Sequence, residues 1–233
     1  MVPKNFLSQR RARRYIVTGM ISPMIVFAFH YSFPFLDLPL VSDNQVITFG
    51  YSAFFQVAII EEVAKFLTFW WVFSQRKSAI HDLPIATMYY CMMASAGFAV
   101  VENISYLMNY GDQVLFTRAV SAIVLHMITG LIMGYYIQMG FSKIMMSEKY
   151  SIKEIFKMNF HKWRHIIFGI TMATIVHGIY DLNLFLPLNI YAELFLFVIL
   201  FFSLFLGKFM ISEGIRLSKN LRGKNFNKDL EHF

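Results

Sequence analysis

The chain has 233 residues, of which 57% are hydrophobic and 18% aromatic, whereas soluble domains average about 45–50% apolar residues. A globule of this length cannot bury so much apolar surface, which excludes an ordinary soluble domain and predicts one integral membrane domain over residues 1–233. The net charge of +7 does not indicate nucleic-acid binding, because the basic residues gather at the ends of apolar segments, where they meet lipid headgroups. The single cysteine, Cys91, excludes an intramolecular disulfide and a multi-cysteine metal site.

Six apolar segments are long enough to cross a bilayer, which takes about 20 helical residues. In chain order they are Tyr15–Leu36, Val46–Phe73, Leu83–Tyr110, Val114–Phe141, Ile166–Leu186 and Ile190–Ile211. The first follows a basic tail, 1–14, but its apolar run is too long for a signal peptide, so we expect an uncleaved helix. We therefore predict an all-α, polytopic membrane protein of about six transmembrane helices.

The distribution of Lys and Arg predicts how these helices are oriented. Basic residues occupy the N-terminal tail, the second and fourth connections and the C-terminal tail, 212–233, whereas the first, third and fifth connections carry none. Both termini are therefore expected in the cytoplasm. The fourth connection, 142–165, mixes charged and apolar residues, so we expect a short amphipathic helix there on the membrane surface.

Ionisable residues lie inside four of the predicted helices, where a charge costs at least about 2.5–3.5 kcal/mol on insertion scales. In chain order, with their polar neighbours, they are Glu61, Glu62, Lys65, then Glu102, Asn103, Tyr106, then His126, and finally His177 and Asp181. Lys65 follows the two glutamates by one helical turn, so it can neutralise either of them. His177 and Asp181 are four residues apart and share a helix face.

The charges of this set indicate one shared site. Four carboxylates against one lysine leave a charge of −3, which protons, a protonated histidine or a bound cation must offset. Closely spaced carboxylates titrate apart, so one holds a proton while another stays ionised, as general acid–base catalysis requires. His126 shares its helix face with Gly130 and Gly134, small residues that let another helix approach closely.

These groups resemble the PrsW family of intramembrane proteases in residue type and in order. The resemblance covers about half of the chain and rests on Glu61-Glu62-Val63-Ala64-Lys65, Gly97 with Glu102-Asn103 and Tyr106, His126, and His177-Gly178 with Asp181. The wider superfamily includes the CAAX prenyl endopeptidases, in which the last polar partner is usually Asn rather than the Asp181 found here. The resemblance implies a multi-pass peptidase of a bacterial or archaeal plasma membrane. It also implies a membrane-tethered protein or peptide as substrate, such as an anti-sigma factor.

The leading hypothesis is an intramembrane endopeptidase. Glu61 or Glu62 would take a proton from water, and His126 would orient that water or bind a metal with it. His177, held by Asp181, would stabilise the oxyanion or act as a second ligand. Lys65 would tune the two glutamates, and supporting roles are expected for Glu102, Asn103 and Tyr106.

Metal use stays open at this point. His126 and His177, with Glu102 or Asp181, form a donor set that suits Zn²⁺, whereas a pair of glutamates is sufficient to activate water without a metal. A second hypothesis is a proton- or cation-coupled transporter that uses the same carboxylates and histidines. It is disfavoured because the sequence shows no inverted repeat. A third, a non-catalytic membrane scaffold, is disfavoured by the cost of the buried charges.

Overall fold

The computed structural model describes residues 9–38, 42–74, 84–141, 160–186, 201 and 204–218. Within these residues the chain forms helices and no strand. Five helical stretches are long and apolar enough to cross a membrane: Gln9–Ser32, Gln45–Ser74, Ile85–Asn109, Ser121–Gly140 and Trp163–Phe185. The predicted all-α, multi-pass fold is confirmed. Most of the sixth predicted helix and of the connection 142–165 lies outside the described residues, and the orientation of the termini stays a prediction.

The first span consists of two helices, α1 (Gln9–Gly19) and α2 (Ser22–Ser32), rather than the one continuous helix predicted. Pro23 explains the break, because proline has no backbone N–H to donate to the carbonyl of Gly19 and its ring crowds that carbonyl. The hydroxyl of Ser22 donates to the Gly19 carbonyl instead. A short 3₁₀ helix, η1 (Pro34–Asp37), follows α2.

The second span changes its hydrogen-bonding pattern midway. α3 (Gln45–Tyr51) continues into a π-helical stretch, η2 (Ser52–Ala58), and then into α4 (Ile59–Ser74). π-Helical turns are rare and occur frequently at functional sites. Here the π-helical stretch ends immediately before the turn of α4 that carries Glu61 and Glu62.

The remaining described spans follow the predicted ranges, except that the last of them begins before its predicted start. They are α5 (Pro84–Tyr110), α6 (Asp112–Phe141) and α8 (Phe160–Phe185). α5 ends at Tyr110, and the next residue, Gly111, has a φ of 78°, in the left-handed region that favours glycine. α8 begins at Phe160, so the end of the connection predicted at 142–165 is helical. A membrane helix satisfies its own backbone hydrogen bonds, so it need not end at the edge of the apolar core.

The first and the last described helices extend into stretches that were predicted as tails. α1 begins at Gln9, inside the tail 1–14. The last described helix, residues 204–218, continues past Ile211 into the tail 212–233. The same internal hydrogen bonding explains both extensions, since polar side chains on a helix outside the bilayer are solvated by water.

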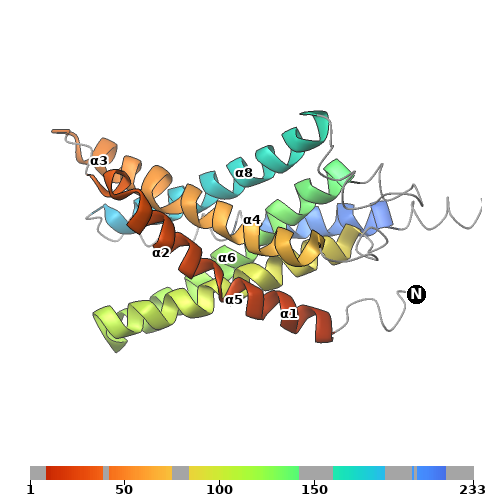
Figure 1. The fold of residues 1–233 in the computed structure, drawn as a ribbon, viewed down its shortest axis with the longest axis horizontal. Coiled ribbons are helices and arrows are strands. Elements are labelled where there is room, and N and C mark those ends of the chain that lie inside the picture. The colour runs from red at the N-terminus through yellow and green to blue at the C-terminus, as the bar shows by residue number, and fades with distance from the viewer. Residues whose placement is uncertain are drawn as a thin grey trace, which may run out of the picture.

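The helices run roughly along the long axis of the molecule (Figure 1). α6 packs against α5 and α8, α1 packs against α5, and α4 packs against α2 and α8. Gly134 of α6 lies against α5 so closely that an added Cβ would be 2.7 Å from Met88 Cα, and one at Gly130 would be 2.8 Å from the Cys91 carbonyl oxygen. The predicted stripe of small residues therefore does bring a neighbouring helix close.

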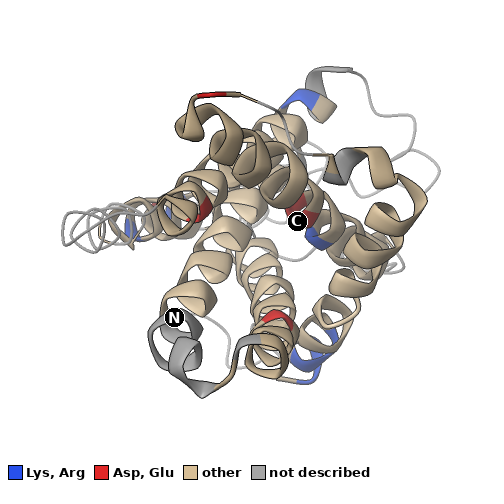
Figure 2. Ribbon diagram, turned by 90° about the vertical axis from the view of Figure 1, so that its left-hand side faces the viewer, with Lys and Arg blue, Asp and Glu red and all other residues tan. Residues whose placement is uncertain are grey.

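The core and the outer surface are both apolar, as expected of a protein surrounded by lipid. The buried ring of Tyr15 on α1 stacks on Phe69 of α4 and Tyr90 of α5, with ring centroids 5.4 and 4.8 Å apart. Large apolar side chains such as Phe27 and Met108 are exposed on the outside. Figure 2 shows that charged residues occupy only a few short stretches of the helices. The buried charges are therefore exceptional within this fold.

Candidate active site

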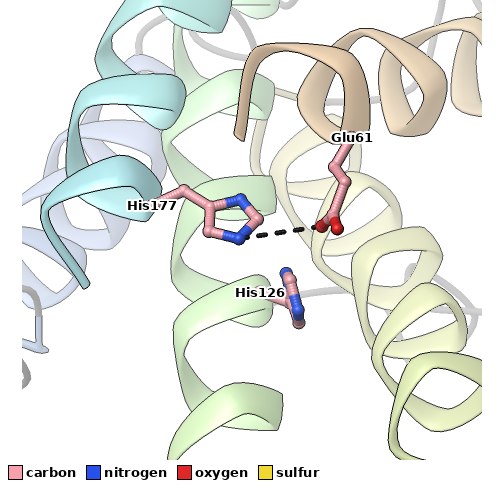
Figure 3. Close-up of side chains that lie close together, drawn as sticks. All are labelled: Glu61, His126 and His177. Atoms are coloured by element: carbon pink, nitrogen blue, oxygen red, sulfur yellow. Dashed lines mark ion pairs between the residues drawn. The ribbon is translucent and has the colours of Figure 1, made fainter. Parts of the chain in front are cut away.

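Side chains from α4, α6 and α8 meet inside the helix bundle. Figure 3 shows Glu61, His126 and His177 pointing toward one another, and their potential metal-ligating atoms lie within 4.8 Å of one another. The dashed line in Figure 3 marks the ion pair between Glu61 Oε2 and His177 Nε2, which are 3.6 Å apart. All three residues are buried, with between 1% and 7% of their surface exposed. The structure thus brings together residues that are more than 100 positions apart in the chain, as the sequence predicted.

His177 lies among three carboxylates. Its Nδ1 is 2.9 Å from Glu62 Oε1, within hydrogen-bonding distance. Its Nε2 is 3.2 Å from Asp181 Oδ2, one turn further along α8, and 3.6 Å from Glu61 Oε2. A carboxylate on one ring nitrogen of a histidine fixes the tautomer and the ring orientation, which leaves the other nitrogen directed into the site.

His126 is held by a cation on one side and a carboxylate on the other. The ammonium of Lys65 lies 2.8 Å from His126 Nδ1, and Glu102 Oε2 lies 2.7 Å from His126 Nε2. An ammonium can only donate hydrogen bonds, so Nδ1 is the acceptor. Nε2 then carries the ring proton and donates a hydrogen bond to Glu102. His126 is thereby fixed in one tautomer.

The two adjacent glutamates are in different situations. Glu62 is fully buried, and its Oε1 accepts hydrogen bonds from Lys65 Nζ at 2.8 Å and from His177. Glu61 is slightly exposed, and its Oε2 is 3.7 Å from Lys65 Nζ, too far for a hydrogen bond. Among the described residues, Glu61 Oε2 has no hydrogen-bond partner. Glu62 thus forms hydrogen bonds with Lys65 and His177 through Oε1, whereas the contacts of Glu61 with the same two residues are longer, at 3.7 and 3.6 Å.

Three buried carboxylate oxygens in this cluster lack a hydrogen bond from the described residues: Glu61 Oε2, Glu62 Oε2 and Asp181 Oδ2. Buried polar atoms are rarely left in this state, and an ion or a water is the usual explanation. Two imidazoles and one carboxylate are also the donor set of many catalytic zinc sites. Glu61, His126 and His177 therefore fit a divalent metal ion. Of the metal candidates predicted from the sequence, Glu102 and Asp181 contact the histidines and do not belong to this group of three.

The other supporting residues lie on α5. Glu102 is partly buried and contacts His126. Asn103 is buried and Tyr106 is half-buried on the same helix. The roles predicted for Asn103 and Tyr106 stay predictions.

Phe98 is a site residue that the sequence interpretation missed. Its ring lies 4.3 Å beneath Lys65 Nζ and 5.1 Å, edge to face, from the His126 ring. A cation over an aromatic face is stabilised by the ring quadrupole. Phe98 precedes Glu102 by four residues and so shares its helix face, a spacing from which it could have been identified.

Comparison with known proteins identifies the family. The model of the PrsW family of intramembrane metalloproteases matches residues 10–207. Protease PrsW of Oceanobacillus iheyensis is 29% identical over 63% of this chain and 60% of its own length. Protease PrsW of Geobacillus kaustophilus is 28% identical over 68% of this chain and 64% of its own length. Protease PrsW of Bacillus subtilis is 26% identical over 83% of this chain and 78% of its own length.

The first two matches thus span less than two thirds of those relatives' length. No solved structure matches this chain. A multi-pass location in the plasma membrane agrees with the five apolar spans and with the bacterial relatives. Because the family model covers most of the chain and the resemblance seen in the sequence is confirmed, the protein belongs to the PrsW family of intramembrane metalloproteases.

Proposed function

We propose that the protein is an intramembrane endopeptidase that hydrolyses peptide bonds of membrane-associated proteins. The observation that carries the proposal is the buried cluster of Glu61, His126 and His177 between helices that can cross a membrane. Hydrolysis inside a bilayer needs groups that hold and activate a water molecule where apolar side chains otherwise exclude it. The cluster offers a Glu61 oxygen that has no hydrogen-bond partner among the described residues, beside two oriented imidazoles, which meets this need.

Glu61 is the residue that we assign to the attacking water. A carboxylate has two oxygens and about four lone-pair sites, so Glu61 can contribute to a metal site and still accept a proton from water. We do not assign Glu62 to this role, because its Oε1 already accepts from Lys65 and His177. In addition Glu61, not Glu62, groups with both histidines, although Glu62 Oε2 also lacks a partner among the described residues. We assign Glu62 instead to holding His177 in position, as Glu102 holds His126.

The metal that we propose for this site is zinc, held by Glu61, His126 and His177. A zinc ion bound there would polarise the peptide carbonyl and lower the pKa of a bound water to about 7. The surrounding carboxylates orient the two histidines so that one nitrogen of each ring faces the site. Asp181, close to His177 Nε2, adds negative charge that favours a bound cation.

The position of the cluster supports a membrane-tethered substrate. The residues belong to the spans Gln45–Ser74, Ser121–Gly140 and Trp163–Phe185, so the cleaved bond has to reach them from within or next to the bilayer. We propose a membrane-anchored protein as the substrate, including a membrane-tethered regulator of the kind that the family resemblance implied. The transporter hypothesis is not favoured, since the relatives that this chain matches in sequence are named as proteases.

The first test is Glu61→Gln, assayed for cleavage of membrane-anchored peptides in detergent and for zinc content. Gln preserves the shape of the side chain and cannot take up a proton, so cleavage should fall by about 10²–10⁴-fold, the usual cost of losing a general base. Zinc binding should weaken as well, because a carboxylate ligand is lost. Dialysis of the wild-type protein against a chelator should abolish cleavage, and zinc should restore it.

The matched control is Glu213→Gln, because Glu213 is outside the cluster, on residues 204–218, and pairs with the exposed Arg216 at 2.6 Å. This variant should cleave at the wild-type rate. Wild-type cleavage by Glu61→Gln would remove Glu61 from the mechanism. Full activity after chelation would show that the protease works without a metal.

A further inference from the structure

The ammonium of Lys65 lies where a cation is expected in a metal site. Lys65 Nζ is 2.8 Å from Glu62 Oε1, 2.8 Å from His126 Nδ1 and 3.7 Å from Glu61 Oε2. The face of Phe98 lies 4.3 Å from it, and only 1% of Lys65 is exposed. Two of the three proposed metal-binding residues, Glu61 and His126, therefore face this ammonium.

The contact with His126 excludes metal binding by the same nitrogen. Lys65 donates a hydrogen bond to the Nδ1 lone pair, while Nε2–H donates a hydrogen bond to Glu102. A zinc–nitrogen bond is about 2.0–2.1 Å long and uses the lone pair itself. One lone pair cannot serve both cations, so His126 can bind a metal through Nδ1 only after Lys65 has withdrawn.

Lys65 can withdraw without losing all its partners. Its side chain is a flexible four-carbon stem with rotatable donors. It sits one turn from both glutamates on α4, and Glu62 Oε1 is its close partner there. Rotation of the stem toward Glu62 Oε2, which has no hydrogen-bond partner among the described residues, would separate Nζ from His126 while keeping the buried ion pair, so the displacement leaves no charge isolated.

We propose that Lys65 is a built-in cation that occupies the metal position of the metal-free protein and releases His126 when a metal binds. This inference rests on the metal site of the proposed function. In this arrangement the lysine keeps the carboxylates and His126 together before a metal ion binds. It also weakens metal binding, because each metal ion must displace an ammonium of the chain.

The test is equilibrium zinc titration of the purified, chelator-stripped full-length protein in detergent, against a competing chromophoric chelator. Lys65→Met removes the charge and keeps a chain of similar length, so zinc should bind roughly 10–100-fold more tightly than to wild type, the range over which groups around a metal change its affinity. Lys208→Met makes the same change at an exposed position on residues 204–218. It should bind zinc as wild type does.

Equal or weaker zinc binding by Lys65→Met would overturn the inference while leaving the metal site in place. Absence of zinc binding by both proteins would overturn the metal site itself, and the lysine's role with it. Should Lys65→Met fail to fold, the zinc-loaded wild-type structure decides the matter. Lys65 Nζ must then lie beyond hydrogen-bonding distance of His126 Nδ1, and zinc bound with that contact intact would refute the displacement.

Discussion

The two histidines of the site are held by helix pairs of different kinds. His126 belongs to α6, which meets α5 through contacts of Gly130 and Gly134 with the neighbouring helix. His177 belongs to α8, which meets α4 through polar contacts with Glu62 at 2.9 Å and Glu61 at 3.6 Å. In the most apolar stretch of each span, 67% of the α6 residues are buried, against 39% in α8.

The residues that pack α5 against α6 are therefore largely distinct from the reactive residues, whereas the residues that join α4 to α8 are themselves reactive. Close contact of Gly130 and Gly134 with α5 holds α5 against α6 in addition to the polar contact between Glu102 and His126. On the other side, Glu62 and His177 both join α4 to α8 and belong to the reactive cluster. Substitutions in the second pair should therefore change stability and activity together, whereas the first pair allows the two to be changed separately.

The largest expected difference is between Glu62→Gln and Glu102→Gln. Glu62 is fully buried and accepts from both Lys65 and His177, so removing its charge should cost about 3–5 kcal/mol of unfolding free energy. The Glu102 side chain is 13% exposed and contacts His126, so its loss should cost about 1–3 kcal/mol. Unfolding by a denaturing detergent in mixed micelles measures both. Equal losses would mean that the α4–α8 contact is not held by its polar pair.

The next effect concerns the α5–α6 contact alone. In Gly134→Ala the new Cβ would meet Met88 Cα at 2.7 Å, and backbone cannot move aside easily. We expect a loss of about 1–3 kcal/mol, as for other overpacked positions. Gly50→Ala is the control, because nothing lies within 4 Å of a Cβ at Gly50, and it should leave the unfolding midpoint unchanged or slightly raised. A neutral Gly134→Ala would show that the two helices are not in tight contact.

Most of the fold could be predicted from the sequence, because long apolar segments in lipid have to be helices. The break in the first span could also have been predicted, since Pro23 lies inside the apolar segment. The π-helical stretch η2 could not, because which carbonyl an N–H selects within a helix depends on the packing of neighbouring helices and has no local signature in this sequence.

The membership of the site was more predictable than its contacts. The cost of burying charge identified Glu61, Glu62, His126 and His177 as one group, and the structure brings them together. Spacing along α4 predicted that Lys65 faces the glutamates, but it carried no information about a partner on another helix. The contact of Lys65 with His126, at 2.8 Å, depends on the rotation of α6 relative to α4, which only the packed structure defines.

The smallest expected effect is at the contact of α8 with η2. A Cβ at Gly178, next to His177, would meet the ring of Phe54 on η2. A side chain can rotate away at a cost of about 0.5–1.5 kcal/mol, whereas the backbone facing Gly134 cannot. Gly178→Ala should therefore destabilise the protein less than Gly134→Ala does in the same mixed-micelle measurement. Because Leu is smaller than Phe, Gly178→Ala should cost little further stability in a Phe54→Leu background, and an unchanged cost there would place the clash elsewhere.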